Sequence, residues 1–136
     1  MIINRLLLIH AVVTAAAAVA LVVAPAWIPA AVDIQLAPAA YLLCYLLGAT
    51  ELGLAYLSYY GSRLGPGVGQ RLILKGFIVV HLATAALEVL AYQQGLSGKI
   101  WGNVALRVVV GALFYYFGLR ERPGGQGANN KPDYDD

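Results

Sequence analysis

Charged side chains are scarce in this sequence. Asp, Glu, Lys and Arg make up only 12% of its 136 residues, whereas 60% of the residues are hydrophobic. A soluble domain usually carries about 25% charged and about 45–50% apolar residues. The apolar excess lies in four long runs, so the sequence predicts a multi-span membrane protein without a separate soluble domain. The formal net charge of +2 is too small to indicate a nucleic-acid partner.

Cysteine is limited to Cys44, which lies inside the second apolar run. A single cysteine excludes an intrachain disulfide and a CxxC pair, which argues against thiol–disulfide chemistry and structural zinc. We predict no metal site. The glycine-rich segment 62–70, SRLGPGVGQ, has no following Lys-Ser/Thr pair and no preceding strand, so it is expected to be a flexible turn and not a phosphate-binding loop.

The apolar runs predict an all-α fold, a bundle of four transmembrane helices within residues 1–119. The expected spans are 3–24, 38–61, 71–94 and 100–119. Residues 120–136 are rich in Gly, Pro, Asn and Asp and are expected to form a disordered cytoplasmic tail. Span 3–24 also resembles a signal peptide with a cleavage site at Ala24-Pro25-Ala26, but its apolar run exceeds the usual length of about 7–15 residues. We therefore expect it to be retained.

Basic residues predict the orientation of the bundle. Four spans place both termini on the same side as the loop between the second and third spans. Seven basic residues fall on this side, against one, Lys99, on the other: Arg5, Arg63, Arg71, Lys75, Arg120, Arg122 and Lys131. The positive-inside rule then predicts cytoplasmic termini, in a bacterial inner membrane or an endoplasmic reticulum membrane.

Ionisable residues inside the spans are the main functional signal, because such groups are costly in hydrocarbon and need partners or a role. A helix rises about 1.5 Å per residue, so depth can be estimated from the span ends. Glu51 and His81 each lie ten residues from the inner ends of their spans, which predicts a pair near the middle of the bilayer. Glu88 and Arg107 lie six and seven residues from the outer ends, which predicts a second pair.

These pairs predict a polar site inside the bundle, which would bind a lipophilic small molecule. As a catalyst it would use acid–base chemistry, such as isomerisation or cyclisation, with Glu51 and His81 exchanging the proton and Arg107 stabilising negative charge. Five further residues are predicted to contribute to binding: His10, Tyr56, Glu88, Asn103 and Tyr115. The sequence leaves open whether the protein is an enzyme. A non-catalytic membrane subunit with structural ion pairs and a proton-coupled transporter are the alternatives.

No cofactor is predicted. A haem held by His10 and His81 is a minor alternative, since the two histidines lie at similar estimated depths. The expected partners are membrane lipid, a lipophilic small molecule, and a second copy of the chain or a partner subunit.

Three segments carry a family resemblance: HAVVTAAAAVALVVAPAWIPA, LLGATELGLAYLSYYG and WGNVALRVVVGALFYYFG. In these segments the chain resembles the small four-span proteins called DoxX-like or hypothetical integral membrane proteins, over roughly residues 3–119. The resemblance implies the four-span fold and assigns no functional residue. Small multidrug transporters share the size, but their essential Glu lies in the first span, which has no acid here. The Thr/Ser/Phe-rich pore signature of the fluoride channels is also absent.

Overall fold

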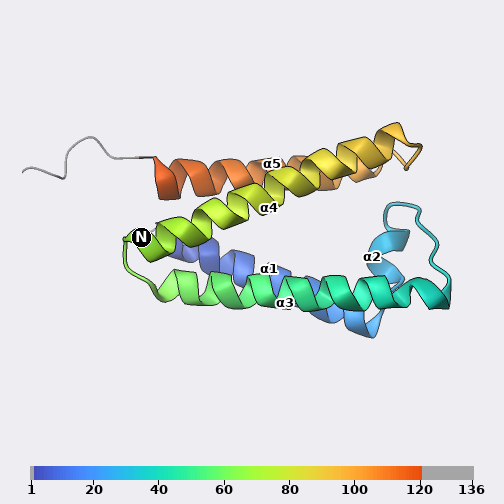
Figure 1. Ribbon diagram of the computed structural model, residues 1–136, viewed down its shortest axis with the longest axis horizontal. Helices are drawn as coiled ribbons and strands as arrows, with labels where there is room; N and C mark the ends of the chain where they lie inside the picture. Colours follow the sequence, from blue (N-terminus) through green and yellow to red (C-terminus); the bar gives the residue numbers. More distant parts are fainter. Residues whose placement is uncertain (1, 121–136) are drawn as a thin grey trace, which may run out of the picture.

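The computed structural model describes residues 2–120, and all regular structure in this range is helical. The predicted disordered tail lies outside the described residues, apart from Arg120. The long helices are α1 (Ile2–Val23), α3 (Tyr41–Arg63), α4 (Val68–Gln93) and α5 (Ile100–Phe114) (Figure 1). Shorter elements are α2 (Trp27–Ala30), the 3₁₀ turn η1 (Pro38–Ala40), and η2 (Tyr115–Leu119), a π-helical turn that continues α5.

Four helical segments are long and apolar enough to cross a membrane: Ile2–Val23, Pro38–Arg63, Val68–Gln93 and Ile100–Leu119. The prediction of an all-α chain with four such segments is confirmed, and it is consistent with a multi-pass membrane protein. The boundaries differ most around the predicted 62–70 turn. There α3 continues to Arg63 and α4 begins at Val68, which leaves a shorter loop.

Proline and glycine explain where two of the long helices end. Helix α1 stops before Pro25, whose ring would clash with the preceding turn and whose nitrogen cannot donate. Helix α4 ends in a Schellman motif, in which the amide of Gly95 bonds to Tyr92 O and that of Leu96 bonds to Ala91 O. Gly95 has φ 104°, a left-handed conformation that suits glycine.

The long helices associate as two pairs. Helix α1 packs against α3, and α4 packs against α5, with little contact between the pairs except near one end. Figure 1 shows the pairs converging at the end that holds the N-terminus and separating towards the other end. We call these the near end and the far end. Gly48 permits close packing in the first pair, since a Cβ there would lie 3.2 Å from the backbone oxygen of Ala18.

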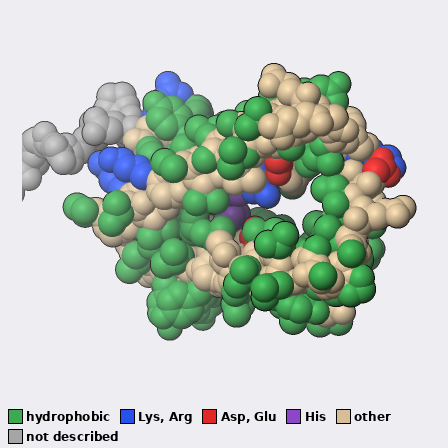
Figure 2. Space-filling view, turned by 45° about the vertical axis from the view of Figure 1, so that its right-hand side comes forward, with side chains coloured by type: hydrophobic (Ala, Val, Ile, Leu, Met, Phe, Trp, Pro, Cys, Tyr) green, Lys and Arg blue, Asp and Glu red, His purple; other side chains and the backbone are tan. Residues whose placement is uncertain are grey.

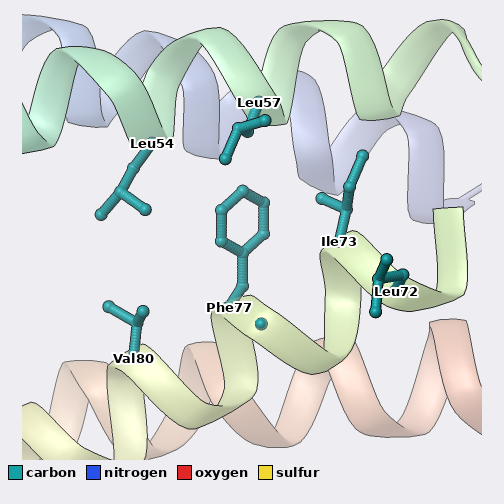
Figure 3. Close-up of a pocket in the computed structure, with 7 residues that line it drawn as sticks. Leu54, Leu57, Leu72, Ile73, Phe77 and Val80 are labelled. Carbon is teal, nitrogen blue, oxygen red and sulfur yellow. The ribbon is translucent and has the colours of Figure 1, made fainter. Parts of the chain in front are cut away.

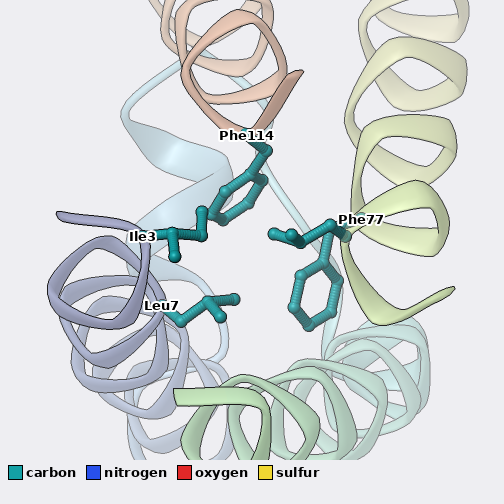
Figure 4. Packing of buried hydrophobic residues seen from close by; sticks show 5 residues of the cluster. Ile3, Leu7, Phe77 and Phe114 are labelled. Atoms are coloured by element: carbon teal, nitrogen blue, oxygen red, sulfur yellow. The ribbon is translucent and has the colours of Figure 1, made fainter. Parts of the chain in front are cut away.

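A cluster of large apolar side chains joins the pairs at the near end. It is formed by Ile3, Leu7, Leu74, Phe77 and Phe114 (Figure 4). The turn η2 lies against it, because Gly118 leaves room for the side chains of Leu74 and Ile3. Burial of apolar surface adds little inside a lipid bilayer, so close packing of this kind is what holds membrane helices together.

A polar contact connects the pairs at the far end. The connector between α1 and α3 carries Asp33, whose carboxylate accepts hydrogen bonds from Lys99 Nζ and Ser97 Oγ, both at 2.7 Å. The bond from Lys99, and secondly that from Ser97, hold the pKa of Asp33 below its usual value. Beside it, Val32 packs against an apolar cluster of α4 and α5. We call this contact the Asp33 latch, since it fastens the first connector to the α4–α5 loop.

Candidate functional site

Polar side chains from α1, α3, α4 and α5 gather between the two helix pairs. In Figure 2 the surface has an opening between the pairs, and acidic, basic and histidine atoms are visible along its inner wall. The contacts arrange these side chains at two levels. One level contains the two histidines, and the other contains the carboxylates and Arg107.

The two histidines form a direct hydrogen bond. His10 Nε2 lies 3.0 Å from His81 Nε2, and His10 Nδ1 lies 2.7 Å from Ser58 Oγ. The Ser58 hydroxyl donates its only proton to Leu54 O at 2.8 Å, so towards His10 it must accept. This network assigns the proton of a neutral His10 to Nδ1 and leaves its Nε2 as an acceptor.

The same logic fixes the protonation of His81. Its Nε2 must carry the proton that is shared with His10, so a neutral His81 has its lone pair on Nδ1. This Nδ1 atom is buried, and it has no hydrogen-bond partner among the described residues. Buried polar atoms are rarely left unpaired, so a buried imidazole nitrogen without a partner is notable.

Aromatic rings surround the histidine pair on its near-end side. The rings of Phe77 and Phe114 lie 5.0 and 5.3 Å from the ring of His10, measured between centroids. Phe114 also lies 6.1 Å from the ring of His81. These contacts shield the imidazoles from the near end of the bundle, so the pair occupies a poorly hydrated environment.

The predicted pair of Glu88 and Arg107 is confirmed as a contact. Glu88 Oε1 accepts from Arg107 Nε at 3.0 Å and from Asn103 Nδ2 at 2.5 Å. The Arg107 and Glu88 side chains are 21% and 13% exposed, so the pair is largely buried. The second oxygen, Glu88 Oε2, is buried and has no partner within residues 2–120.

The predicted pair of Glu51 and His81 is wrong. His81 bonds to His10 instead, at the level of Ser58. Seven residues separate Ser58 from Glu51, and seven separate His81 from Glu88; both intervals correspond to about 10.5 Å towards the far end. Glu51 therefore lies at the level of Glu88 and makes no contact with His81.

The error has a geometric cause. The depth estimate assumed that neighbouring helices end in a common plane. In the structure Ser58, five residues from the end of α3, lies level with His81, thirteen residues from the start of α4. The first turn of α4 lies beside the start of α1 and the end of α3, because the buried Gln70 donates to Asn4 Oδ1 and to Gly61 O.

Two predicted binding residues do not border the interior. Tyr56 and Tyr115 are each 60% exposed and lie on the outer surface of the bundle. Tyr56 stacks against Tyr60 on the same helix. The remaining predicted residues all lie at one of the two polar levels: His10, Glu51, His81, Glu88, Asn103 and Arg107.

An apolar groove lies beside the histidine pair, between α3 and α4 (Figure 3). Its volume is about 350 Å³, and it is lined by Leu54, Leu57, Leu72, Ile73, Gly76, Phe77 and Val80. The lining has no polar side chain, which suits a hydrocarbon group. Phe77 belongs to this groove and also contacts the ring of His10, so the two features share one wall.

Sequence reasoning missed several residues of the site. Ser58 lies seven residues after Glu51, on the same face of α3, and this spacing was the available signal. Phe77 and Phe114 carry no such signal, because apolar residues in an apolar helix do not reveal which face is interior. The two histidines named for the haem alternative are bonded to each other through their Nε2 atoms in this structure, and that alternative stays untested.

No protein-family model matches the chain, and comparisons with curated proteins and with solved structures found no match. The resemblance to DoxX-like proteins therefore stays a prediction. The function has to be inferred from the geometry of the two polar levels.

Proposed function

We propose that the protein binds a lipophilic small molecule between its helix pairs. It would move a proton from one carbon of this molecule to another, as a membrane isomerase or cyclase would. The observation that carries the proposal is the hydrogen bond between His10 and His81. Ser58 orients this hydrogen bond. Because the bond uses the proton on Nε2 of His81, Nδ1 of His81 is left as an acceptor in a poorly hydrated environment. An imidazole is the side chain best suited to exchange a proton near neutral pH.

The proposed step needs only groups of this chain. Nδ1 of His81 takes a proton from a C–H group of the substrate, and the proton on its Nε2 moves to Nε2 of His10. Reversal of the transfer returns a proton to a different carbon, which shifts a double bond and so isomerises the substrate. Arg107 would stabilise negative charge on a part of the substrate that reaches the carboxylate level, since only its Nε has a hydrogen-bond partner among the described residues.

The apolar groove supports a lipophilic substrate. Binding sites for small molecules usually have volumes of about 300–1,000 Å³ and mainly apolar walls. At about 350 Å³ the groove is large enough for part of a hydrocarbon chain, and Phe77 separates it from the imidazoles by one ring. A substrate could enter from the lipid without crossing water.

We further propose that the near end faces the cytoplasm. Five of the described basic residues lie there or on the adjoining turns of the helices, against Lys99 at the far end: Arg5, Arg63, Arg71, Lys75 and Arg120. This bias follows the positive-inside rule for a bacterial inner membrane or an endoplasmic reticulum membrane. The opening between the pairs would then face the outer half of the bilayer.

Deuterium exchange tests the proposal for any lipophilic substrate that exchanges a proton at carbon. Proteoliposomes that contain a total lipid extract of the source organism are incubated in D₂O, and lipophilic species that gain deuterium at carbon are identified by mass spectrometry. The wild type should label at least one species. His81→Gln keeps a donor near the position of Nε2 but removes the base, so labelling should fall by about a hundredfold or more.

The controls separate chemistry from folding. Thr50→Val removes a hydroxyl that bonds only within its own helix and should leave labelling unchanged. His81→Gln should elute from size exclusion like the wild type, because the bond to His10 can be retained. If His81→Gln labels as fast as the wild type, the proposed catalytic role is wrong.

Proton-coupled transport is the second candidate. It is supported by the opening between the pairs that the space-filling view shows (Figure 2). A transporter would move a species across the bilayer under an imposed pH gradient without adding deuterium to carbon.

A further inference from the structure

The apolar groove between α3 and α4 opens towards the surface of the bundle. Two leucines that line it, Leu57 and Leu72, are 45% and 69% exposed, so the described residues leave the groove uncovered. Figure 3 shows the side chains of Leu57 and Phe77 pointing towards one another across it. Because both helices are long and apolar enough to cross a membrane, the groove should face the hydrocarbon of the bilayer.

Gly76 gives the groove its depth on the α4 side. A Cβ built at this position would meet no atom within 4 Å, so the space in front of it is open. Leu72 and Val80 lie one turn before and one turn after it, on the same face of the helix, and both line the groove. A side chain at position 76 would therefore fill the space between these two without a clash.

Positive charge lies where the groove approaches the near end. Arg63 ends α3, and Arg71 directly precedes the first residue of α4 that lines the groove; both side chains are exposed. The acidic residues of the described chain, Asp33, Glu51 and Glu88, lie at the far end or at the carboxylate level, and none of them pairs with these arginines. Uncompensated basic side chains beside an apolar groove match an anionic lipid.

We propose that the groove binds the hydrocarbon chain of an anionic lipid, whose headgroup lies at the near end beside Arg63 and Arg71. The chain runs along α4 from Leu72 to Val80, a length of about 12 Å. The apolar walls recognise the chain, and the arginines recognise the headgroup. The inference rests on the proposed function and deepens it, because it names the class of the lipophilic molecule that binds beside the histidine pair.

Photo-cross-linking tests this proposal with phospholipids that carry a diazirine in the middle of one acyl chain. The protein is reconstituted into nanodiscs with a phosphatidylglycerol probe or with a phosphatidylcholine probe of the same chains, and the cross-linked peptides are quantified by mass spectrometry. In the wild type, phosphatidylglycerol should label segments 54–57 and 72–80 about fivefold or more above the exposed face of α1 around Val19. It should also label them about threefold or more above phosphatidylcholine.

Three variants assign the parts of the site. Gly76→Leu should lower labelling of the groove by about fivefold or more, because the new side chain occupies the space of the lipid chain. Gly102→Leu is the matched control, since this glycine of α5 also meets nothing within 4 Å and does not line the groove; labelling should stay within about twofold of the wild type. Arg63→Gln combined with Arg71→Gln should bring the two probes to equal labelling.

Each alternative outcome overturns a stated part. Equal labelling of the groove in wild type and Gly76→Leu overturns the groove as the place of binding. Gly76→Val replaces this variant if Gly76→Leu does not elute from size exclusion like the wild type. Equal labelling by the two probes in the wild type overturns the anionic class, and labelling spread evenly over α1 and the groove overturns a specific site.

The failure of this inference can be told apart from the failure of the proposed function. His81→Gln leaves the groove intact, so it should cross-link like the wild type while it loses deuterium labelling. A wild type that labels carbon with deuterium but shows no preferred cross-linking in the groove refutes only the lipid site.

Discussion

The contact between Glu88 and Arg107 allows a quantitative test of the packing between α4 and α5. Removing one partner of a buried ion pair typically costs about 3–5 kcal/mol, because the other charge is left buried and uncompensated. The 21% exposure of Arg107 places the expected cost near the lower end, so Arg107→Gln and Glu88→Gln should each lower the free energy of unfolding by about 3 kcal/mol. This corresponds to a change of more than a hundredfold in the unfolding equilibrium.

The double variant distinguishes the ion pair from general packing. Two glutamines at these positions carry no charge and can bond to each other, so the double variant should be more stable than the sum of the single effects predicts. We expect a coupling energy of about 1–3 kcal/mol. Asn103 remains in all variants, and it can still donate to whichever side chain occupies position 88.

Reversible unfolding in mixed micelles, followed by helical circular dichroism, would measure these free energies. Lys75→Gln serves as the exposed control, because the side chain of Lys75 lies on the surface and makes no ion pair among the described residues. Strictly additive costs for the two single substitutions would refute the ion pair as a coupled unit. So would a control that destabilises the protein as much as Arg107→Gln does.

Further predictions concern the α1–α3 contact and the far end. Gly48→Ala should destabilise the protein by about 1–3 kcal/mol in the same unfolding assay, because the new methyl group would crowd the backbone of Ala18; Gly53→Ala, which meets nothing within 4 Å, should be neutral or stabilising by up to about 1 kcal/mol. Asp33→Asn should weaken the latch without straining the backbone, because asparagine also tolerates the left-handed conformation of this residue, φ 63°. Access to the interior can be measured with Glu51→Cys in a Cys44→Ser background. A water-soluble thiol reagent should label this variant faster when Asp33→Asn is added. The pKa of Asp33 lies below its usual 3.8, so the latch should contribute to the stability of the folded protein above pH 3.8 and lose this contribution as the pH falls below that value. The difference in melting temperature between wild type and Asp33→Asn should therefore disappear at low pH.

The four helices and the pair of Glu88 and Arg107 could be predicted for related reasons. Apolar runs of this length have few alternatives to a membrane-crossing helix. Glu88 and Arg107 lie on consecutive helices joined by a short loop, so their register follows from the loop itself. Counting residues from a shared turn is reliable because a single hairpin fixes both positions.

The partner of His81 could not be found in this way. His10 lies 71 residues away in sequence, and the two side chains meet only because the second helix pair packs against the first at the near end. That packing depends on the relative tilt and axial shift of the pairs, which Phe77, Phe114 and Gly118 help to set. Residue counting along one helix does not contain this information.

The two polar levels divide the interior by hydration. The neutral imidazoles lie where the helix pairs converge and where Phe77 and Phe114 exclude water, whereas the charged side chains lie where the pairs separate. This order is physically consistent, because charge is least costly where space remains for water or a polar ligand. Seven residues of helix, or about 10.5 Å, separate the levels. A substrate that contacts both levels therefore has to extend over about 10 Å.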